Sequence, residues 1–311
     1  MRRLRLSLSF SFLAAAALSA QQADIRVDVN LVRVVATVKD AAGQLVGSLS
    51  KDDFTILDNN VPQQIAVFER HTVQPLSVSL LIDISGSTAK DLKYEVDSIT
   101  KFLHALFSEG NPKDAVALYS FNYQVINQNY FTRNAQSIER SLHTLHAEAG
   151  TSLYDAIYLA SRDLENRDGR RVLVIVTDGG DTTSTMDFHA ALEAAQLADS
   201  VIYPILVVPI PNDAGRNVGG ENALTTLSLG TGGHVFAPTL GAELDKAFTH
   251  LIEDLRTQYM LGYYPKDVPL TKNRFHRLDV RVRNPALRAL ARNGYYGEAE
   301  GSSGSQSRRS R

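Results

Sequence analysis

The chain has 311 residues, of which 44% are hydrophobic and 21% charged, a composition ordinary for a soluble globular protein. It contains no cysteine, which excludes a disulfide, a thiolate metal site and a cysteine nucleophile. The formal net charge at pH 7 is −2. Removal of residues 1–20 takes away three of the 32 basic residues and none of the 34 acidic ones, leaving −5. This acidic balance argues against nucleic acid as a partner.

Residues 1–20 have the pattern of a signal peptide. Three arginines stand within the first five residues, a largely apolar stretch follows, and the segment ends in small residues. The apolar stretch is short for a membrane span, although an uncleaved anchor is the alternative because Leu18 is not ideal at its position before the cut. We therefore expect an exported protein, periplasmic or at the cell envelope or outside the cell, with no stable membrane span after cleavage.

Residues 23–72 are expected to form a small N-terminal β unit. Apolar residues alternate between Ile25 and Val38, and turn signals follow at residues 40–43 and 58–60. A unit of about four strands is too small to bury a two-layer core by itself.

Residues 76–257 change to alternating strands and helices, which predicts an α/β domain with a doubly wound, mostly parallel sheet. Apolar runs predict strands at 77–83, 115–121, 123–131, 171–177 and 201–208. The strands at 115–121 and 123–131 are separated by too few residues for a crossover connection, so they must be antiparallel. Pro204 lies inside the last run and implies a bulge there or a weaker strand. Apolar spacing predicts helices at 89–107, 135–145, 152–164, 186–198, 222–229 and 243–257.

Residues 258–297 return to β character, with clean alternation of apolar residues from His276 onward. Since neither β flank can build a core alone, we expect 23–72 and 258–297 to join in one small β-sandwich, with the α/β domain inserted between them. The Gly/Ser-rich residues 298–311 are expected to be a disordered tail.

Asp83, Ser85 and Ser87 follow the strand 77–83, in the loop before the next helix. Ligands bind at the carboxyl ends of strands in open α/β sheets. One carboxylate and two hydroxyls are hard oxygen ligands, which suit Mg²⁺, Mn²⁺ or Ca²⁺ far better than zinc or copper. Three oxygens do not fill an octahedron, so other loops, water or a partner must supply the rest. The alternative is that Asp83 and Ser87 cap the following helix.

Two later residues, Thr151 and Asp178, favour the metal site. Thr151 opens a helix and Asp178 directly follows a buried strand, so a parallel sheet brings both to the edge where Asp83 lies. The order Asp-x-Ser-x-Ser, then Thr, then Asp resembles the metal-ion-dependent adhesion site of the von Willebrand factor type A domain family. The resemblance covers roughly the central 180 residues, about the size of one α/β domain. The flanking β units also resemble those of bacterial exported proteins that carry this domain.

The resemblance implies a role for each of the five residues. Ser85 and Ser87 would coordinate the ion directly, Thr151 directly or through water, and Asp83 and Asp178 directly or through bridging waters. An Asp or Glu carboxylate from a protein partner would then complete the octahedron. Two nearby carboxylates leave Mg²⁺ roughly neutral, and an open position attracts one more anion.

Asp155 and Asp181 are candidates for supporting roles. Asp155 lies four residues after Thr151 on the same helix face and is placed to bond a metal-site water or the neighbouring loop. An ordinary helix-face acid is the alternative. Asp181 is a candidate for the same role, and its alternative is to start the next turn.

Three classes of function fit these residues. A hydrolase with Asp83 as nucleophile would need a second acid two residues on, where the chain has Ser85, and no Gly-x-Ser-x-Gly elbow is present. A scaffold whose ion only orders loops uses the same residues as an adhesion module. We expect a non-enzymatic, divalent-cation-dependent protein-binding module, with the scaffold as the alternative. Specificity would come from the loops at 181–187 and 211–220.

Overall fold

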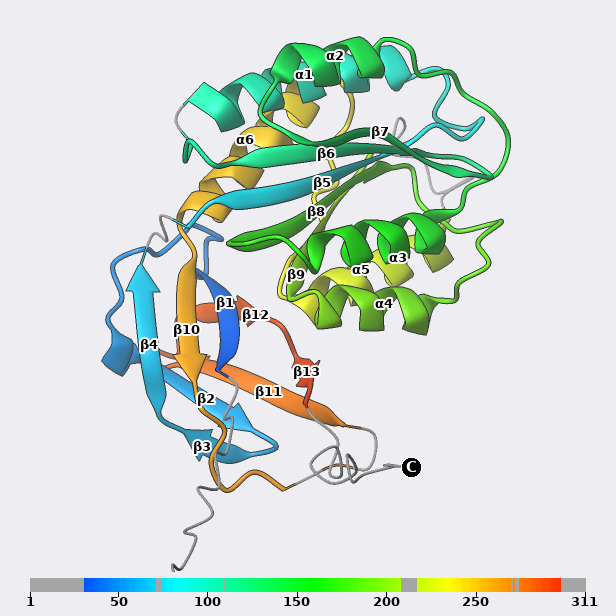
Figure 1. The fold of residues 1–311 in the computed structure, drawn as a ribbon. Coiled ribbons are helices and arrows are strands. Elements are labelled where there is room, and N and C mark those ends of the chain that lie inside the picture. The colour runs from blue at the N-terminus through cyan, green and yellow to red at the C-terminus, as the bar shows by residue number, and fades with distance from the viewer. Residues whose placement is uncertain are drawn as a thin grey trace, which may run out of the picture.

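The computed structural model describes residues 31–70, 74–108, 110–207, 217–269, 271 and 274–297. These residues form an α/β domain and a β-sandwich beside it (Figure 1). The predicted signal peptide and tail, and most of the predicted loop at 211–220, lie outside the described residues.

The α/β domain is built on a five-stranded sheet with the order β7-β6-β5-β8-β9. Its strands are β5 (Leu76–Asp83), β6 (Ala115–Phe121), β7 (Val125–Thr132), β8 (Arg170–Thr177) and β9 (Ser200–Leu206). All neighbours are parallel except β7, which runs antiparallel to β6. Every residue of the central β5 is buried, which explains its mostly apolar sequence. The predicted doubly wound, mostly parallel sheet is confirmed.

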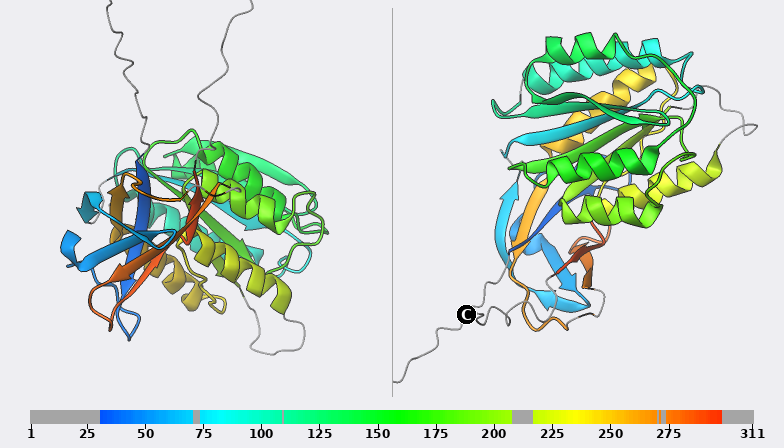
Figure 2. Two further views of the ribbon diagram at one scale, coloured as in Figure 1. Left: turned by 90° about the horizontal axis from the view of Figure 1, so that it is seen from below. Right: turned by 45° about the vertical axis from the view of Figure 1, so that its right-hand side comes forward.

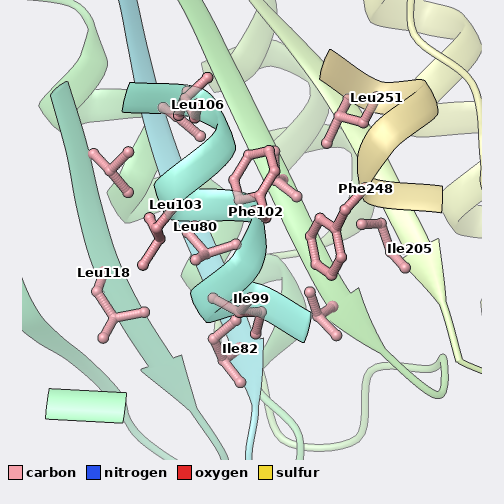
Figure 3. Packing of buried hydrophobic residues seen from close by; sticks show 14 of the residues in the cluster. Leu80, Ile82, Ile99, Phe102, Leu103, Leu106, Leu118, Ile205, Phe248 and Leu251 are labelled. Carbon is pink, nitrogen blue, oxygen red and sulfur yellow. The ribbon is translucent and has the colours of Figure 1, made fainter. Parts of the chain in front are cut away.

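Six helices cover the two faces of this sheet (Figures 1 and 2). They are α1 (Leu92–Ser108), α2 (Ala135–Leu142), α3 (Leu153–Leu164), α4 (Phe188–Leu197), α5 (Val218–Thr231) and α6 (Ala242–Arg256). One apolar core joins α1, α2 and α6 to the sheet, and a second joins α3, α4 and α5 to its other face. Figure 3 shows the first core, where Phe102 of α1 meets Phe248 of α6 with ring centroids 5.0 Å apart.

Pro204 is accommodated inside β9 without a bulge, since its register with β8 is continuous. The carbonyl of Pro204 accepts a 2.9 Å hydrogen bond from the backbone N–H of Phe236, on the side away from β8. In a parallel strand the nitrogen and carbonyl of one residue point to the same side, so the missing N–H of proline costs the β8–β9 ladder nothing.

Two helices begin three or more residues away from the position that the sequence pattern predicts. Helix α1 starts at Leu92, three residues later than expected, because turns occupy the residues before it. Helix α5 starts at Val218, four residues earlier than expected. The side chain of Asn217 accepts a 2.9 Å hydrogen bond from the N–H of Gly220, and this N-cap outweighs the poor helix propensity of two glycines.

The β-sandwich consists of two four-stranded sheets with the orders β12-β1-β10-β4 and β13-β11-β2-β3. The N-terminal flank contributes β1 (Val32–Lys39), β2 (Phe54–Asp58), β3 (Val61–Gln63) and β4 (Ile65–Arg70), with a short 3₁₀ turn at Lys51–Asp53. The C-terminal flank contributes β10 (Tyr259–Tyr263), β11 (Phe275–Val282), β12 (Arg288–Ala291) and β13 (Gly294–Tyr296). Both sheets mix strands of the two flanks, so the predicted joint sandwich is confirmed.

The sandwich and the α/β domain are connected by side chains as well as by the chain itself. The chain runs from α6 directly into β10 (Figure 1). Lys39 of β1 forms a 3.2 Å ion pair with the buried Asp254 of α6. In the described part of the chain, no helix has the length and apolar character needed to cross a membrane.

Candidate functional site

The polar segments singled out in the sequence meet at the carboxyl edge of the five-stranded sheet. Asp83 is the last residue of β5, and Asp178 follows the last residue of the neighbouring parallel strand β8. The loop that carries Thr151 is held at the same edge by two backbone bonds. The N–H of Glu148 donates to the carbonyl of Ile84 at 2.9 Å, and the N–H of Ser152 donates to the carbonyl of Asn122 at 2.6 Å.

Asp83 is fully buried and fixed at both carboxyl oxygens. The backbone N–H of Ser85 donates to Oδ1 at 2.8 Å, and the hydroxyl of Thr177 donates to Oδ2 at 2.5 Å. Burial raises the pKa of Asp83 to about 6, while these hydrogen bonds act in the opposite direction. The carboxylate is therefore held in one orientation before any ligand arrives.

Ser85, Ser87 and Asp178 continue the cluster outward to the surface. The hydroxyl oxygens of Ser85 and Ser87 lie 3.0 Å apart, with Ser85 buried and Ser87 exposed. Burial also raises the pKa of Asp178, and a hydrogen bond from the Ser87 side chain opposes that rise. Two carboxylates and two hydroxyls thus lie together, contributed by two adjacent strand ends.

The geometry does not show Asp83 or Ser87 capping the following helix. The first N–H groups of α1 donate to backbone carbonyls instead, with Leu92 bonded to Thr88 at 3.0 Å and Glu95 bonded to Asp91 at 3.1 Å. The carboxylate of Asp83 points into the site and takes its donors from Ser85 and Thr177.

Thr151 is held through its backbone. Its N–H donates to the hydroxyl of Thr182 at 2.9 Å, and its carbonyl accepts from the N–H groups of Thr182 and Thr183. The Thr151 hydroxyl has no hydrogen-bond partner among the described residues, which leaves it available to a ligand.

Asp155 and Asp181 both serve the loop that follows Asp178. Asp155 accepts from the backbone N–H groups of Thr185 and Met186, the latter at 2.7 Å. Asp181 accepts from the N–H of Tyr154 at 3.3 Å and from the hydroxyl of Ser184. Asp155 therefore bonds the neighbouring loop, which is one of the two supporting roles expected for it. Asp181 bonds a residue of its own turn and the first turn of α3.

Glu95 is an acidic residue of this region that sequence analysis missed. It lies in the first turn of α1, is only 1% exposed, and its Oε2 has no hydrogen-bond partner among the described residues. Burial raises its pKa to about 8, and the negative charges of Asp83, Asp91 and Asp178 add to the rise. A signal was present, because Glu95 lies three residues after Leu92 and four before Ile99, on the apolar stripe of the helix.

Glycines allow the loop after β8 to approach the start of α5. Gly179 and Gly180 have φ angles of 100° and 101°, in the left-handed region that glycine adopts without strain. A Cβ on Gly220 would lie 2.4 Å from the backbone nitrogen of Gly180. The loop beside Asp178 is thus tightly seated against α5.

The donor set fits a hard divalent cation. In the residues that the structure describes, no group of three or more His, Cys, Asp or Glu side chains is arranged to hold a metal ion. The cluster here has two carboxylates, Asp83 and Asp178, and draws its remaining oxygens from hydroxyls. Oxygen-only ligands of this kind suit Mg²⁺, Mn²⁺ or Ca²⁺.

Residues 78–180 match the family model described as the von Willebrand factor type A domain. The match supports a von Willebrand factor type A domain in this part of the chain. It includes all five residues of the candidate site and extends from β5 to the glycines after β8. A search of curated proteins found no match.

A comparison with solved structures gives several matches to this chain. The vWF domain of the type V pili tip protein Mfa5 from Porphyromonas gingivalis is 15% identical to this chain, with a TM-score of 0.49. The match covers 58% of this chain and 95% of the Mfa5 domain. The conserved hypothetical protein BatB from Bacteroides thetaiotaomicron is 20% identical, with a TM-score of 0.45, and the match covers 58% of this chain and 98% of the BatB chain. The pilus adhesin SpaC from Lactobacillus rhamnosus GG is 11% identical, with a TM-score of 0.48, and the match covers 79% of this chain and 48% of the SpaC chain.

Proposed function

We propose that this protein is a non-enzymatic binding module in which a divalent cation joins it to a carboxylate of a protein partner. The observation that carries the proposal is the cluster of Asp83, Ser85, Ser87 and Asp178 at the carboxyl edge of the sheet, inside the region matched by the von Willebrand factor type A family. Mg²⁺ is the proposed ion, with Mn²⁺ and Ca²⁺ as alternatives.

Each residue has a proposed part in holding the ion. Ser85, Ser87 and Thr151 would supply neutral oxygens, and Asp83 and Asp178 would supply the two negative charges. A bound cation would favour the ionised form of both carboxyl groups, whose pKa values burial raises. With its charge nearly balanced, the ion keeps an affinity for one more anion, such as an Asp or Glu side chain of the partner.

Exposed apolar side chains beside the cluster support a protein partner. Tyr123 is 52% exposed and packs against Gly150, the residue before Thr151. Val218 is 60% exposed and opens α5, next to the glycine loop that follows Asp178. Apolar surface around a polar centre is typical of a protein-binding site.

Export to the periplasm, the cell envelope or the medium belongs to the same proposal. It rests on the basic and apolar pattern of residues 1–20 alone. A hydrolytic function is disfavoured, because the position two residues after Asp83 carries a serine where an aspartyl-phosphate chemistry needs a general acid.

Thermal unfolding of the purified protein in Mg²⁺, Mn²⁺, Ca²⁺ or a chelator tests the cation site. An ion at about a hundred times its dissociation constant should stabilise the folded state by about 2.7 kcal/mol. We expect this stabilisation in the parent and in the control Asp97→Ala, which alters an exposed acid of α1, and its loss in Asp83→Ala and Asp178→Ala. Equal responses in all four proteins, or none in the parent, would overturn the proposal.

A second measurement separates adhesion from a scaffold whose ion only orders loops. If a partner carboxylate completes the coordination, a Glu-containing peptide and the ion must raise each other's affinity by the same factor. Isothermal titration of the peptide with and without the ion measures that factor. An ion that binds but leaves the peptide affinity unchanged supports the scaffold.

A further inference from the structure

A cavity of about 50 Å³ lies where the α/β domain meets the β-sandwich, at the amino end of the parallel strands. Its walls come from β1, from the first residues of β8 and β9, and from the residues around β10 and β12. One water needs about 10–15 Å³ measured in this way, so the cavity has room for several waters or one tetrahedral oxyanion.

The charged residues that line the cavity are four arginines and one aspartate, a formal charge of +3. The arginines are Arg33, Arg170, Arg171 and Arg292, and the aspartate is Asp199. Asp199 is already paired with Arg292. The lining therefore carries an excess of positive charge that no acid in its own wall neutralises.

Arg170 is the most buried of the four arginines. It is only 7% exposed and has no ion pair with an acid among the described residues. Its Nη1 donates to the carbonyl of Leu255 and to Oε1 of Gln258 at 3.0 Å, while its Nε–H has no partner in the described chain. Burial lowers the pKa of Arg170 to about 10, and electrostatic interactions with Tyr203 and Asp114 oppose this lowering only in part.

Arg292 approaches the same cavity from the sandwich. It is 8% exposed, and its Nη2 donates to the backbone carbonyl of Arg33 at 2.5 Å. Its Nε–H, like that of Arg170, has no partner among the described residues. Two buried guanidinium groups, one from each part of the molecule, thus line one cavity.

A wider groove adjoins the cavity. This groove has a volume of about 620 Å³ and shares Arg33, Gln74, Gly169 and Met260 with the cavity wall. The charged residues of the groove are Arg33, Lys113, Glu69 and Asp168, and the exposed Arg33 belongs to the wall that the groove and the cavity share.

We propose that this cavity is a binding site for a small oxyanion of the phosphate or sulfate class, which serves as the counter-ion of Arg170 and links the β-sandwich to the α/β domain. Guanidinium groups are well matched to such oxyanions, because their planar N–H donors pair with two oxygens at once. The site is separate from the proposed cation site, since the length of β8, about 23 Å, lies between Arg170 and Thr177.

Isothermal titration of inorganic phosphate and of sulfate into the full-length protein, at ionic strength held constant with KCl, tests this site. We expect saturable binding at one site per chain, accompanied by a rise in melting temperature. The same titration with glycerol 1-phosphate compares the affinity of a phosphate ester with that of inorganic phosphate. Tighter binding of this ester would show that the anion is one end of a larger ligand lying in the groove, and weaker binding would show that the free anion is the ligand.

Three variants identify the residues that bind the anion. Arg170→Gln should abolish binding, and Arg33→Gln, which alters an exposed residue and should fold normally, should weaken it about three- to tenfold. Arg140→Gln removes an exposed arginine of α2 and is the control. Absence of saturable binding in the parent, or an affinity in Arg33→Gln equal to that of the control, would overturn the proposal even if Arg170→Gln does not fold.

Discussion

The hydroxyl of Thr177, the last residue of β8, donates a 2.5 Å hydrogen bond to Oδ2 of Asp83, the last residue of β5. Both residues are fully buried. This bond joins two adjacent strand ends and orients the carboxylate at the centre of the candidate cation site. Thr177 is not part of the motif that points to the site, yet it determines how the most buried residue of that motif is presented.

Replacing Thr177 with valine should therefore affect both stability and cation binding. Valine has nearly the shape of threonine but lacks the hydroxyl, so the buried carboxylate of Asp83 loses one hydrogen-bond donor. We therefore expect the free energy of unfolding to fall by about 1–3 kcal/mol. Cation affinity should fall by about tenfold, as is usual when a group that orients a metal ligand is removed. Thr225→Val, at an exposed position of α5, is the control for chemical denaturation and cation titration. A cation affinity equal to that of the parent would contradict the orienting role.

Glu95→Gln should stabilise the cation-free protein at alkaline pH. Burial raises the pKa of Glu95 from its ordinary value of 4.5 to about 8, so the folded state keeps a proton that the unfolded state releases. Stability is then lost progressively as the pH rises from about 4.5 to about 8, and glutamine removes that loss. In chelator we expect a gain of about 2–4 kcal/mol at pH 8 and under about 1 kcal/mol at pH 5.

Asp97→Asn alters an exposed acid two residues further along α1 and controls for the removal of one charge. Urea unfolding of the three proteins at both pH values gives the comparison. A gain from Glu95→Gln that is the same at pH 5 and pH 8 would show that Glu95 is ionised in the folded protein.

His234 should make the protein less stable in acid. Its Nε2 lies 3.3 Å from Nζ of Lys39 and 3.2 Å from Oδ2 of Asp254. Asp254 would favour a charged imidazole, but it is already paired with Lys39, and burial together with the Lys39 charge lowers the pKa of His234 to about 4. The neutral imidazole is thus the folded form, and stability is lost as the pH falls from about 6.5 towards 4.

Between pH 7 and pH 5 this residue should account for a loss of roughly 2 kcal/mol. His234→Gln should flatten that part of the stability profile, whereas His143→Gln, at an exposed position, should not. The measurement is the free energy of unfolding at half-unit steps of pH. A parent profile as flat as that of His234→Gln would refute the assignment of a neutral His234.

Tyr263→Phe should weaken the β-sandwich. The hydroxyls of Tyr263 and Tyr295 each donate to the buried Asp58 at 2.8 Å, and Nδ1 of His276 lies 3.0 Å from its other oxygen. Asp58 belongs to the N-terminal flank and its three partners to the C-terminal flank, so the cluster holds the two flanks together. Loss of one hydrogen bond to this buried acid should cost about 1.5–3 kcal/mol in thermal unfolding. Tyr264→Phe, at a half-exposed position, should cost nothing measurable.

Much of the fold could be predicted because it depends on local patterns. The runs that became β5 and β8 are mostly apolar, and this pattern alone indicates strands buried on both faces. Since parallel strands end at one edge of a sheet, the positions of Asp83 and Asp178 in the chain were enough to predict their proximity. The joining of the two β flanks followed from the inability of either to bury a core.

The sequence by itself thus determined the order of strands and helices, the composition of the oxygen cluster and the need for the two flanks to pair. Only the tertiary structure decided that Glu95 is buried among acids, that Thr177 orients Asp83, and that Arg170 and Arg292 line one cavity. Arg170 and Arg292 are far apart in the chain, and periodicity carries no information about which distant side chains will meet. Burial and hydrogen bonding depend on those neighbours, because it is the folded surroundings that remove water from a polar group and supply, or fail to supply, its partner.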